Sequence, residues 1–315
     1  MEIRTYRPGD EAAQVSIYNE AAGELPKFKA ATPDEVRRRV QAADYDPSTR
    51  FLAVEDGQPI GYAGFHANGR VNYPWCRKGH EAAAQPLFDR VLQAMKERGL
   101  SRAFAVYRAD WPVQQEFFNR NGFRLRREMV NFVLDRAAMP APSARSGCPI
   151  GSTTPDDVPA ILELGANVLQ VKDRTALERH LFHNPYFSAD AVFALRENAD
   201  APPRAVGIFI ANAAYADPRQ VDAAMPCFRL GAFGTEGMSS KRLNGLFSFL
   251  SADSPDAPAL ALDLMDHATQ RRGGAVAAFG AQVPSDAGHL LRFYEQYFQR
   301  QASFPFLERS LPLDP

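Results

Sequence analysis

Short, largely apolar stretches bounded by turn signals predict strands in the first third of the chain. Residues 51–54 and 60–65 are such stretches, residues 3–6 lie in an alternation of polar and apolar positions, and Asp56-Gly57 between the first two is typical of a tight hairpin turn. A helix is predicted to begin at residues 32–35, where Thr32 can act as the capping residue. The proline that follows suits the first helical position, and the glutamate at the end of this motif can close a capping box.

A second helix is predicted by a continuous apolar face that ends at Gly99. Its apolar residues lie at helical spacing: Leu87, Phe88, Val91, Leu92 and Met95. Because this helix intervenes, we expect the next strand, 103–107, to return parallel to its neighbour. A short helix over 113–121 and a strand over 129–134 complete a sequence of strand, two helices, three strands, helix, strand, helix and strand.

The same pattern is predicted a second time. Ile3, Pro8 and Asp10 recur with the same mutual spacing as Ile150, Pro155 and Asp157, at an offset of 147 residues. Further counterparts are Ile60-Gly61 with Val206-Gly207, Phe65 with Phe209, and Phe117-Phe118-Asn119 with Phe293-Tyr294-Glu295. Two copies of one domain are the simplest interpretation of this repeat, and each copy has to be judged separately as a site for chemistry.

The repeat and the local composition predict where the copies begin and end. Residues 139–148 are rich in proline, alanine and serine and lack periodicity, so we expect a linker there between domains 1–138 and 149–315. In the second copy we expect strands at 192–195, 205–211, 228–233 and 275–279, helices at 242–250 and 290–297, and insertions at about 212–226 and 251–259. The predicted fold class is mixed α+β, with a mixed, mostly antiparallel sheet flanked by helices in each domain.

Composition restricts the partners. The chain has 36 basic and 37 acidic residues, so its net charge favours neither a nucleic acid nor an anionic membrane as partner. Its three cysteines show no metal-site spacing, and the N-terminus lacks the apolar core of a signal peptide. No stretch of about 18 apolar residues occurs. We therefore expect a cytoplasmic protein without a membrane segment or a metal.

Two motifs give the chain a family resemblance. Residues 73–79, YPWCRKG, lead into a helix, and residues 117–123, FFNRNGF, close the first copy. With the order of elements, they resemble the GCN5-related N-acetyltransferase (GNAT) superfamily, and the tandem arrangement is similar to the two-domain mycothiol synthase type. The resemblance implies an N-acetyltransferase that uses acetyl-CoA as co-substrate and transfers the acyl group directly to a small-molecule or peptide amine.

The resemblance also implies where the carrier binds. In this family an Arg/Gln-x-x-Gly-x-Gly/Ala loop at a helix N-terminus holds the diphosphate on its backbone amides, a position where free N–H groups favour anions. The corresponding residues are Arg77, Lys78, Gly79 and His80 in the first copy and Arg242, Asn244, Gly245 and Leu246 in the second. Both loops depart from the motif, because Glu81 or Ala82 replaces a glycine in one and Phe247 replaces a small residue in the other.

The expected catalytic residues lie in the second copy. The family's acid is often the tyrosine of a Phe-Tyr-Glu motif, which matches Tyr294, whereas the first copy has Phe118 at that place. A phenol near pKa 10 can reprotonate a departing thiolate. Glu236 is the candidate base, and either residue could instead be structural, as a packed aromatic or a solvated loop carboxylate.

Several alternatives stay open from the sequence. The chain could be a non-catalytic acyl-CoA-binding or structural pair of domains, or the first copy could be catalytic with water or Tyr107 as the acid. His180 and His183 form a weak metal pattern, and Cys76 beside Arg77 is a weak candidate nucleophile. The segments at about 22–31 and 171–187 are expected to frame the acceptor, whose identity the sequence leaves open.

Overall fold

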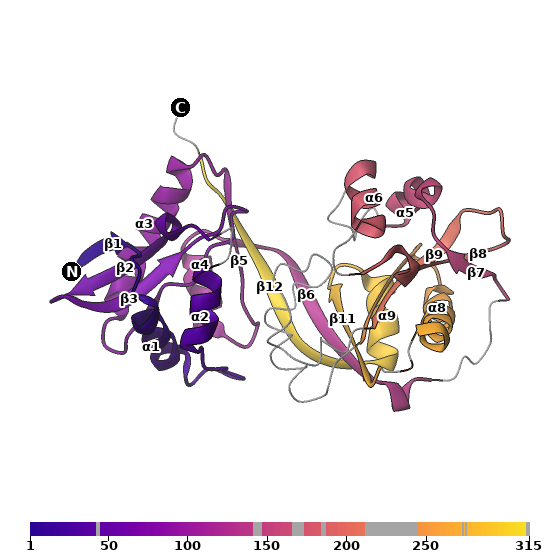
Figure 1. The fold of residues 1–315 in the computed structure, drawn as a ribbon, viewed down its shortest axis with the longest axis horizontal. Helices are drawn as coiled ribbons and strands as arrows, with labels where there is room; N and C mark the ends of the chain where they lie inside the picture. The colour runs from indigo at the N-terminus through magenta and orange to yellow at the C-terminus, as the bar shows by residue number, and fades with distance from the viewer. Residues whose placement is uncertain are drawn as a thin grey trace. The chain divides into compact units, whose positions relative to one another are not determined.

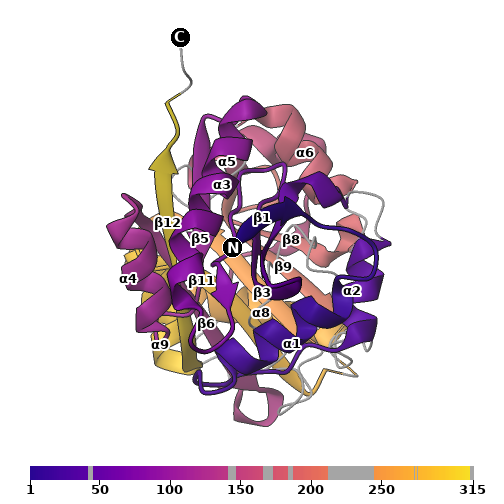
Figure 2. The same ribbon diagram turned by 90° about the vertical axis from the view of Figure 1, so that its left-hand side faces the viewer.

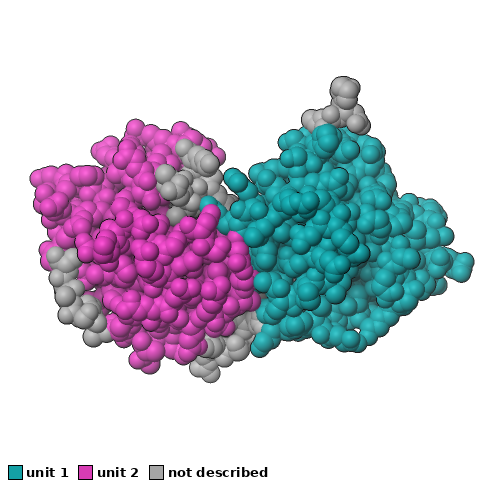
Figure 3. Space-filling model, turned by 180° about the vertical axis from the view of Figure 1, so that it is seen from behind, with its two compact units in different colours: residues 1–127, 304–315 teal, residues 128–303 magenta. Residues whose placement is uncertain are grey.

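The structure is a computed structural model that describes most of the chain. The described residues are 1–41, 45–140, 147–165, 173–183, 187–211, 245–272, 274 and 276–312. They form two compact units: unit 1 comprises residues 1–127 and 304–315, and unit 2 comprises residues 128–303 (Figures 1 and 3). No described helix combines the length and the apolar character that crossing a membrane requires.

Unit 1 contains a four-stranded antiparallel sheet in the order β1-β2-β3-β4. Its strands are β1 (Glu2–Thr5), β2 (Arg50–Glu55), β3 (Gln58–Gly64) and β4 (Trp75–Cys76). A fifth strand, β5 (Arg102–Val106), pairs antiparallel with residues 306–310 of the last strand, β12 (Gln299–Ser310). The last strand of unit 1 therefore comes from the C-terminal end of the chain.

Helices cover both faces of this sheet (Figure 2). They are α1 (Glu11–Ala22), α2 (Pro33–Val40), α3 (Ala84–Glu97), which follows the short 3₁₀ turn η2 (Glu81–Ala83), and α4 (Pro112–Arg120). On one face, the apolar side of α3 packs on β2 and β3, with Leu87, Phe88 and Val91 fully buried. On the other face, Ile17 of α1 joins Trp75 and Trp111 in a separate aromatic cluster. Burial of these two apolar surfaces holds the unit together.

Unit 2 contains a mixed sheet in the order β6-β11-β10-β9-β8-β7. Its strands are β6 (Arg124–Asp135), β7 (Ile150–Ser152), β8 (Val192–Arg196), β9 (Pro203–Ala211), β10 (Gly245–Ser251) and β11 (Ala278–Pro284). Adjacent strands are antiparallel, except that β10 and β11 run parallel. The paired part of β6, residues 129–135, comes from the first half of the sequence.

Four helices among the described residues flank the sheet of unit 2 on its two faces. They are α5 (Val158–Leu164), α6 (Arg174–Phe182), α8 (Ala257–Arg272) and α9 (Gly288–Tyr297). Leu177 and Leu181 of α6 belong to one apolar cluster, and Leu264 of α8 and Phe293 of α9 belong to another. In Figure 1, α5 and α6 accordingly lie on one side of the sheet and α8 and α9 on the other.

Most of the predicted elements are confirmed, as is the mixed α+β class. The hairpin between β2 and β3 turns at Asp56 and Gly57, both with positive φ. Thr32 and Glu35 form the expected capping box, with reciprocal bonds of 3.3 and 3.0 Å. Gly99 ends α3 with a φ of +70°. The parallel return of the fifth strand is seen in the bridge between Arg70 and Phe104.

One prediction in the second copy is wrong. Residues 245–250 were expected to be helical, but they belong to strand β10, and the helix, α8, follows it where an insertion was expected. β10 lies between two strands and carries apolar residues on both faces, so its apolar run does not alternate. The expected strand at 228–233 lies outside the described residues, as do residues 141–146 of the expected linker.

Candidate functional site

In unit 1, the segment that leads into β4 meets β5 at one described parallel bridge, between Arg70 and Phe104. Phe104 O accepts from Val71 N–H at 2.8 Å. Further along, Tyr73 N–H donates instead to the hydroxyl of Tyr107, at 2.6 Å. A tyrosine hydroxyl therefore bridges the gap between the strands at a position where backbone pairing would otherwise continue.

The same separation occurs in unit 2. β10 and β11 pair at Gly245 with Phe279 and at Leu246 with Gly280, after which β11 continues in register with β6 alone. The hydroxyl of Tyr294, on α9, donates to Phe247 O at 3.2 Å. The edge of β10 that no longer pairs with β11 thus also receives a tyrosine hydroxyl.

Tyr294 is enclosed by aromatic rings. Its side chain is 1% exposed and contacts the rings of Phe132, Phe249, Phe293 and Phe298 at centroid distances of 5.0–5.7 Å. Burial raises the pKa of the Tyr294 hydroxyl well above its ordinary value, although a backbone hydrogen bond with Phe249 opposes the shift. The phenol therefore keeps its proton at neutral pH, as a proton donor must.

The loop after β4 brings together the four predicted carrier-binding residues of the first copy. Arg77 donates through its guanidinium to Glu20 at 2.6 Å and to Pro59 O at 3.1 Å. Lys78 N–H donates to Glu20 at 2.9 Å, and the Lys78 ammonium pairs with Glu24 at 2.5 Å. Both cations are thus already bonded to carboxylates of α1 and of the residues that follow it.

The rest of this loop also has partners within unit 1. Gly79, with a φ of +85°, donates its N–H to the carboxylate of Glu81 at 3.0 Å. His80 N–H donates to Arg77 O at 3.0 Å, and its imidazole lies 3.4 Å from Glu55. An N–H group that already has an acceptor at this distance is not free for a phosphate oxygen.

In unit 2, the equivalent loop lies between β10 and α8. Gly245 and Leu246 lie at the start of the strand rather than at a helix N-terminus, so the reason for assigning them to phosphate does not hold. Two aspartates occupy the loop, with Asp253 paired to Arg292 at 2.8 Å and Asp256 lying 3.8 Å from Arg204. Among described residues, no side chain accepts from the amides of 252–259.

The predicted residues Glu236, Arg242 and Asn244 lie outside the described part of the chain. Their roles therefore stay predictions. The carboxylates around the first loop and the two aspartates of the second were not identified from the sequence. Glu81 was noted only as a replacement for a glycine of the motif, and the bonds that Glu20 accepts join residues 57 and 58 positions apart, which local spacing does not reveal.

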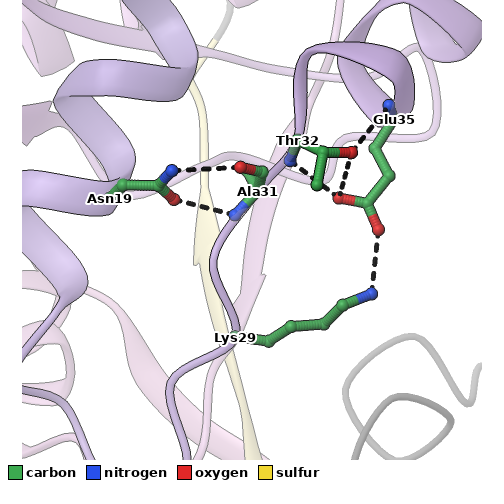
Figure 4. A network of polar contacts seen from close by, with 5 residues as sticks. All are labelled: Asn19, Lys29, Ala31, Thr32 and Glu35. Atoms are coloured by element: carbon green, nitrogen blue, oxygen red, sulfur yellow. Dashed lines mark hydrogen bonds and ion pairs between the residues drawn. The ribbon is translucent and has the colours of Figure 1, made fainter.

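The connection between α1 and α2 in unit 1 is fixed by polar bonds. The side-chain amide of Asn19 donates to Ala31 O at 3.0 Å and accepts from Ala31 N–H at 2.7 Å. Glu35 joins this segment to the start of α2 through Thr32 and through Lys29, whose ammonium lies 2.8 Å away (Figure 4). Trp111 Nε1 adds a bond of 3.0 Å to Pro26 O.

The corresponding side of unit 2 has a hollow of about 440 Å³ beside α6. It is lined by Thr175, Glu178, Arg179 and His183, which lie at helical spacing. His180 points elsewhere, with its ring 6.2 Å from that of Phe187, and burial lowers its pKa. The hollow lies in the segment that was expected to frame the acceptor.

Cys76 is not placed as a nucleophile. It is buried, and burial raises the pKa of its thiol to about 12, with a further contribution from Glu81. Arg77, which would lower that pKa, is bonded to Glu20. Within the described part of the chain, no three His, Cys, Asp or Glu side chains are grouped so that they could hold a metal ion.

Comparisons with known proteins identify relatives of this fold. No family model matches the sequence. A mycothiol acetyltransferase from Acidothermus cellulolyticus is 29% identical over 116 residues, which are 34% of this chain and 34% of that protein. The match thus spans about a third of the curated relative.

Solved structures match over almost the whole chain. A GCN5-related N-acetyltransferase from Sphaerobacter thermophilus is similar over 98% of this chain and 95% of its own, with 16% identity and a TM-score of 0.59. A tandem GNAT protein from the clavulanic acid biosynthesis pathway is similar over 100% of this chain and 99% of its own, with 11% identity and a TM-score of 0.53. At these identities the similarity concerns the fold.

Proposed function

Because the chain has the fold of the GNAT superfamily in a tandem arrangement, we propose that it is an acyl-CoA-dependent N-acyltransferase whose transfer site lies in unit 2. The observation that carries the proposal is the position of Tyr294. Its buried, protonated hydroxyl donates to Phe247 O of β10, just after the last residue of β10 that pairs with β11. Acetyl-CoA is the expected carrier.

In this proposal the carrier supplies an activated acyl group as a thioester. Tyr294 holds the proton that the departing thiolate takes up, and the aromatic residues around it exclude water from the hydroxyl. The phenol is neutral and therefore carries a proton at neutral pH. Because burial raises its pKa above that of a thiol, transfer of this proton to the thiolate is uphill in these surroundings, so the acid role requires that the bound carrier replace part of the apolar enclosure. Glu236 is the candidate base for the ammonium proton of the acceptor, which is a small-molecule or peptide amine.

The loop between β10 and α8 in unit 2 is a better candidate for binding the diphosphate of the carrier than the loop after β4 in unit 1. In unit 1, carboxylates accept from the amides of Lys78 and Gly79, so the residues there do not fit a diphosphate. In unit 2, Arg204 and Arg292 offset the charge of the two loop aspartates. Two prolines, Pro255 and Pro258, reduce the number of N–H donors there, so we expect weaker carrier binding than a complete glycine-rich loop provides.

Substitution of Tyr294 by phenylalanine tests the proposal. We expect turnover of acetyl-CoA with a panel of amines to fall about 10²–10⁴-fold, the range for loss of a general acid, while affinity for CoA stays within about threefold. Tyr107→Phe is the matched control, because it removes the equivalent hydroxyl of unit 1 and should leave turnover unchanged. Equal turnover in wild type and Tyr294→Phe would refute the acid role.

The second candidate is a non-catalytic tandem GNAT protein. It is favoured by the loop of unit 1, whose donors are bonded within the unit, and by Pro255 and Pro258, which lie just before α8 and in its first turn. If neither heat nor a thermal shift accompanies addition of acetyl-CoA or CoA to the wild-type chain at about millimolar concentration, this second candidate replaces the first.

A further inference from the structure

The loop after β4 in unit 1 has anionic partners supplied by the chain itself. Glu20 receives the Arg77 guanidinium and Lys78 N–H, and Glu81 receives Gly79 N–H. The Lys78 ammonium pairs with Glu24. The carboxylates of Glu20 and Glu81 therefore accept from the N–H groups of Lys78 and Gly79, which are the donors that a bound diphosphate would need.

These carboxylates are negatively charged at neutral pH. The hydrogen bond from Lys78 N–H, together with that from Arg77, holds the pKa of Glu20 below its ordinary range despite some desolvation. Bonds from its own backbone and from Gly79 N–H lower the pKa of Glu81. A diphosphate entering this loop would meet two like charges at hydrogen-bond distance, which opposes binding.

A second, independent feature occupies the region between the strands of unit 1. The Tyr107 hydroxyl takes Tyr73 N–H, and the Tyr107 ring stacks on Phe118 at 5.6 Å. Trp111 lies against Tyr107 at 6.2 Å and bonds the α1–α2 connection at Pro26. Tyr107 is partly buried among these rings, and desolvation raises its pKa to about 12. In unit 1, the Tyr107 side chain thus occupies the space beside Tyr73 N–H, and Glu20 and Glu81 occupy the amides of the loop after β4.

We infer that Glu20 and Glu81 are specificity-determining residues that exclude phosphate-bearing carriers from unit 1, so that each chain binds one acyl-CoA. The exclusion of such carriers from unit 1 is argued from the contacts in unit 1 alone. The one acyl-CoA site per chain rests on the proposed function of unit 2. Arg77 and Lys78, although they match the family's basic loop, then serve to tie α1 to the residues ahead of α3.

Calorimetric titration of the full chain with CoA tests the stoichiometry. We expect one site per chain, and Arg77→Ala should change its Kd by less than about threefold, because the guanidinium is not in contact with the carrier. Thermal unfolding of the variant confirms that it is folded. Two sites in the wild type, or a Kd raised more than about tenfold in folded Arg77→Ala, would overturn the inference.

A double variant tests the cause of the exclusion. Glu20→Ala with Glu81→Ala frees the two amides, and titration with inorganic pyrophosphate should then show a site that the wild type lacks. Glu24→Ala is the matched control: it removes the same charge next to Lys78 but frees no amide, so no site should appear. A folded double variant without added pyrophosphate binding would overturn the role of the carboxylates.

The two proposals fail in different ways. If the wild type binds no CoA while the double variant gains a pyrophosphate site, the transfer function of unit 2 fails and the exclusion from unit 1 stands. If the wild type binds one CoA while the double variant gains nothing, the carboxylates are not the determinant and the transfer function is unaffected.

Discussion

Gly245 gives a direct test of whether a glycine in unit 2 serves packing or a ligand. It is the first residue of β10 and pairs with both Ala211 and Phe279. A Cβ built at this position would lie 2.5 Å from Val276 Cγ1, 3.0 Å from Phe279 Cδ1 and 3.2 Å from Ala278 O. The structure therefore gives a packing reason for glycine here, whereas the family resemblance gives a phosphate reason.

The expected cost of Gly245→Ala follows from these contacts. A carbon at 2.5 Å from a buried methyl group requires Val276 or the strand to shift, and overpacking of this kind costs about 1–3 kcal/mol. In a unit of this size we expect the unfolding midpoint to fall by about 2–10 °C. The affinity for CoA, measured well below that midpoint, should not change.

Gly207→Ala is the matched control for this substitution. Gly207 lies in the neighbouring strand β9, and a Cβ there would have contacts of 3.4–3.5 Å with Leu264 and Phe247, which are ordinary van der Waals distances. We expect this variant to be as stable as the wild type or more stable by about 0.5–1 kcal/mol, because alanine loses less backbone entropy on folding. Thermal unfolding of both variants measures the difference.

Two outcomes would refute the reasoning. If Gly245→Ala and Gly207→Ala unfold at the same temperature, the close approach of Val276 does not constrain the site. If Gly245→Ala keeps its stability but loses affinity for CoA, the glycine serves the carrier, as the resemblance implied.

Two further predictions concern polar groups of the core. Asp10, bonded to Arg4 at 2.7 and 2.8 Å, has its pKa lowered chiefly by that bond, so it stabilises unit 1 above its unfolded pKa and loses this effect as pH falls through the folded value. Asp10→Asn should therefore destabilise by about 1–3 kcal/mol at pH 7, with the difference from wild type shrinking below about pH 4 in pH-dependent denaturation; a constant difference would contradict this. Asn131 is 1% exposed, accepts from Gln282 at 2.9 Å and leaves its Nδ2 without a partner. The double substitution Asn131→Leu with Gln282→Leu should unfold at or above the wild-type temperature, and a large drop would show that the amide pair stabilises the sheet.

Of the long helices, α3, which has one buried face, was predictable from the sequence, and α8, which is buried on several faces, was not. α3 has a clear apolar stripe and a glycine at its end, and it was predicted correctly. In α8, residues 260–265 are all buried, so no polar face marks the helix. Pro255 and Pro258 precede this run and suggest a break, although proline is tolerated in a first helical turn. Periodicity could not separate this helix from the buried strand before it.

The candidate site was predictable in part. The basic loop of unit 1 was found from its sequence, but its partner Glu20 belongs to a helix far away along the chain. The exchange of terminal strands was equally hidden. Residues 129–135 of the first half pair with β11 in unit 2, and residues 306–310 pair with β5 in unit 1. Such pairings depend on the completed fold rather than on any local pattern.

In both units a tyrosine hydroxyl bonds to the strand backbone, but the tyrosine comes from a different element in each. In unit 1 the hydroxyl comes from Tyr107, just after strand β5, and accepts a backbone N–H, while the helix presents Phe118. In unit 2 the helix itself presents Tyr294, whose hydroxyl donates to a backbone carbonyl. The Tyr294 hydroxyl also accepts a hydrogen bond from the backbone of Phe249, which opposes the rise of its pKa, so the hydroxyls of both units accept a backbone N–H and the bond to Phe247 O is the additional feature of unit 2.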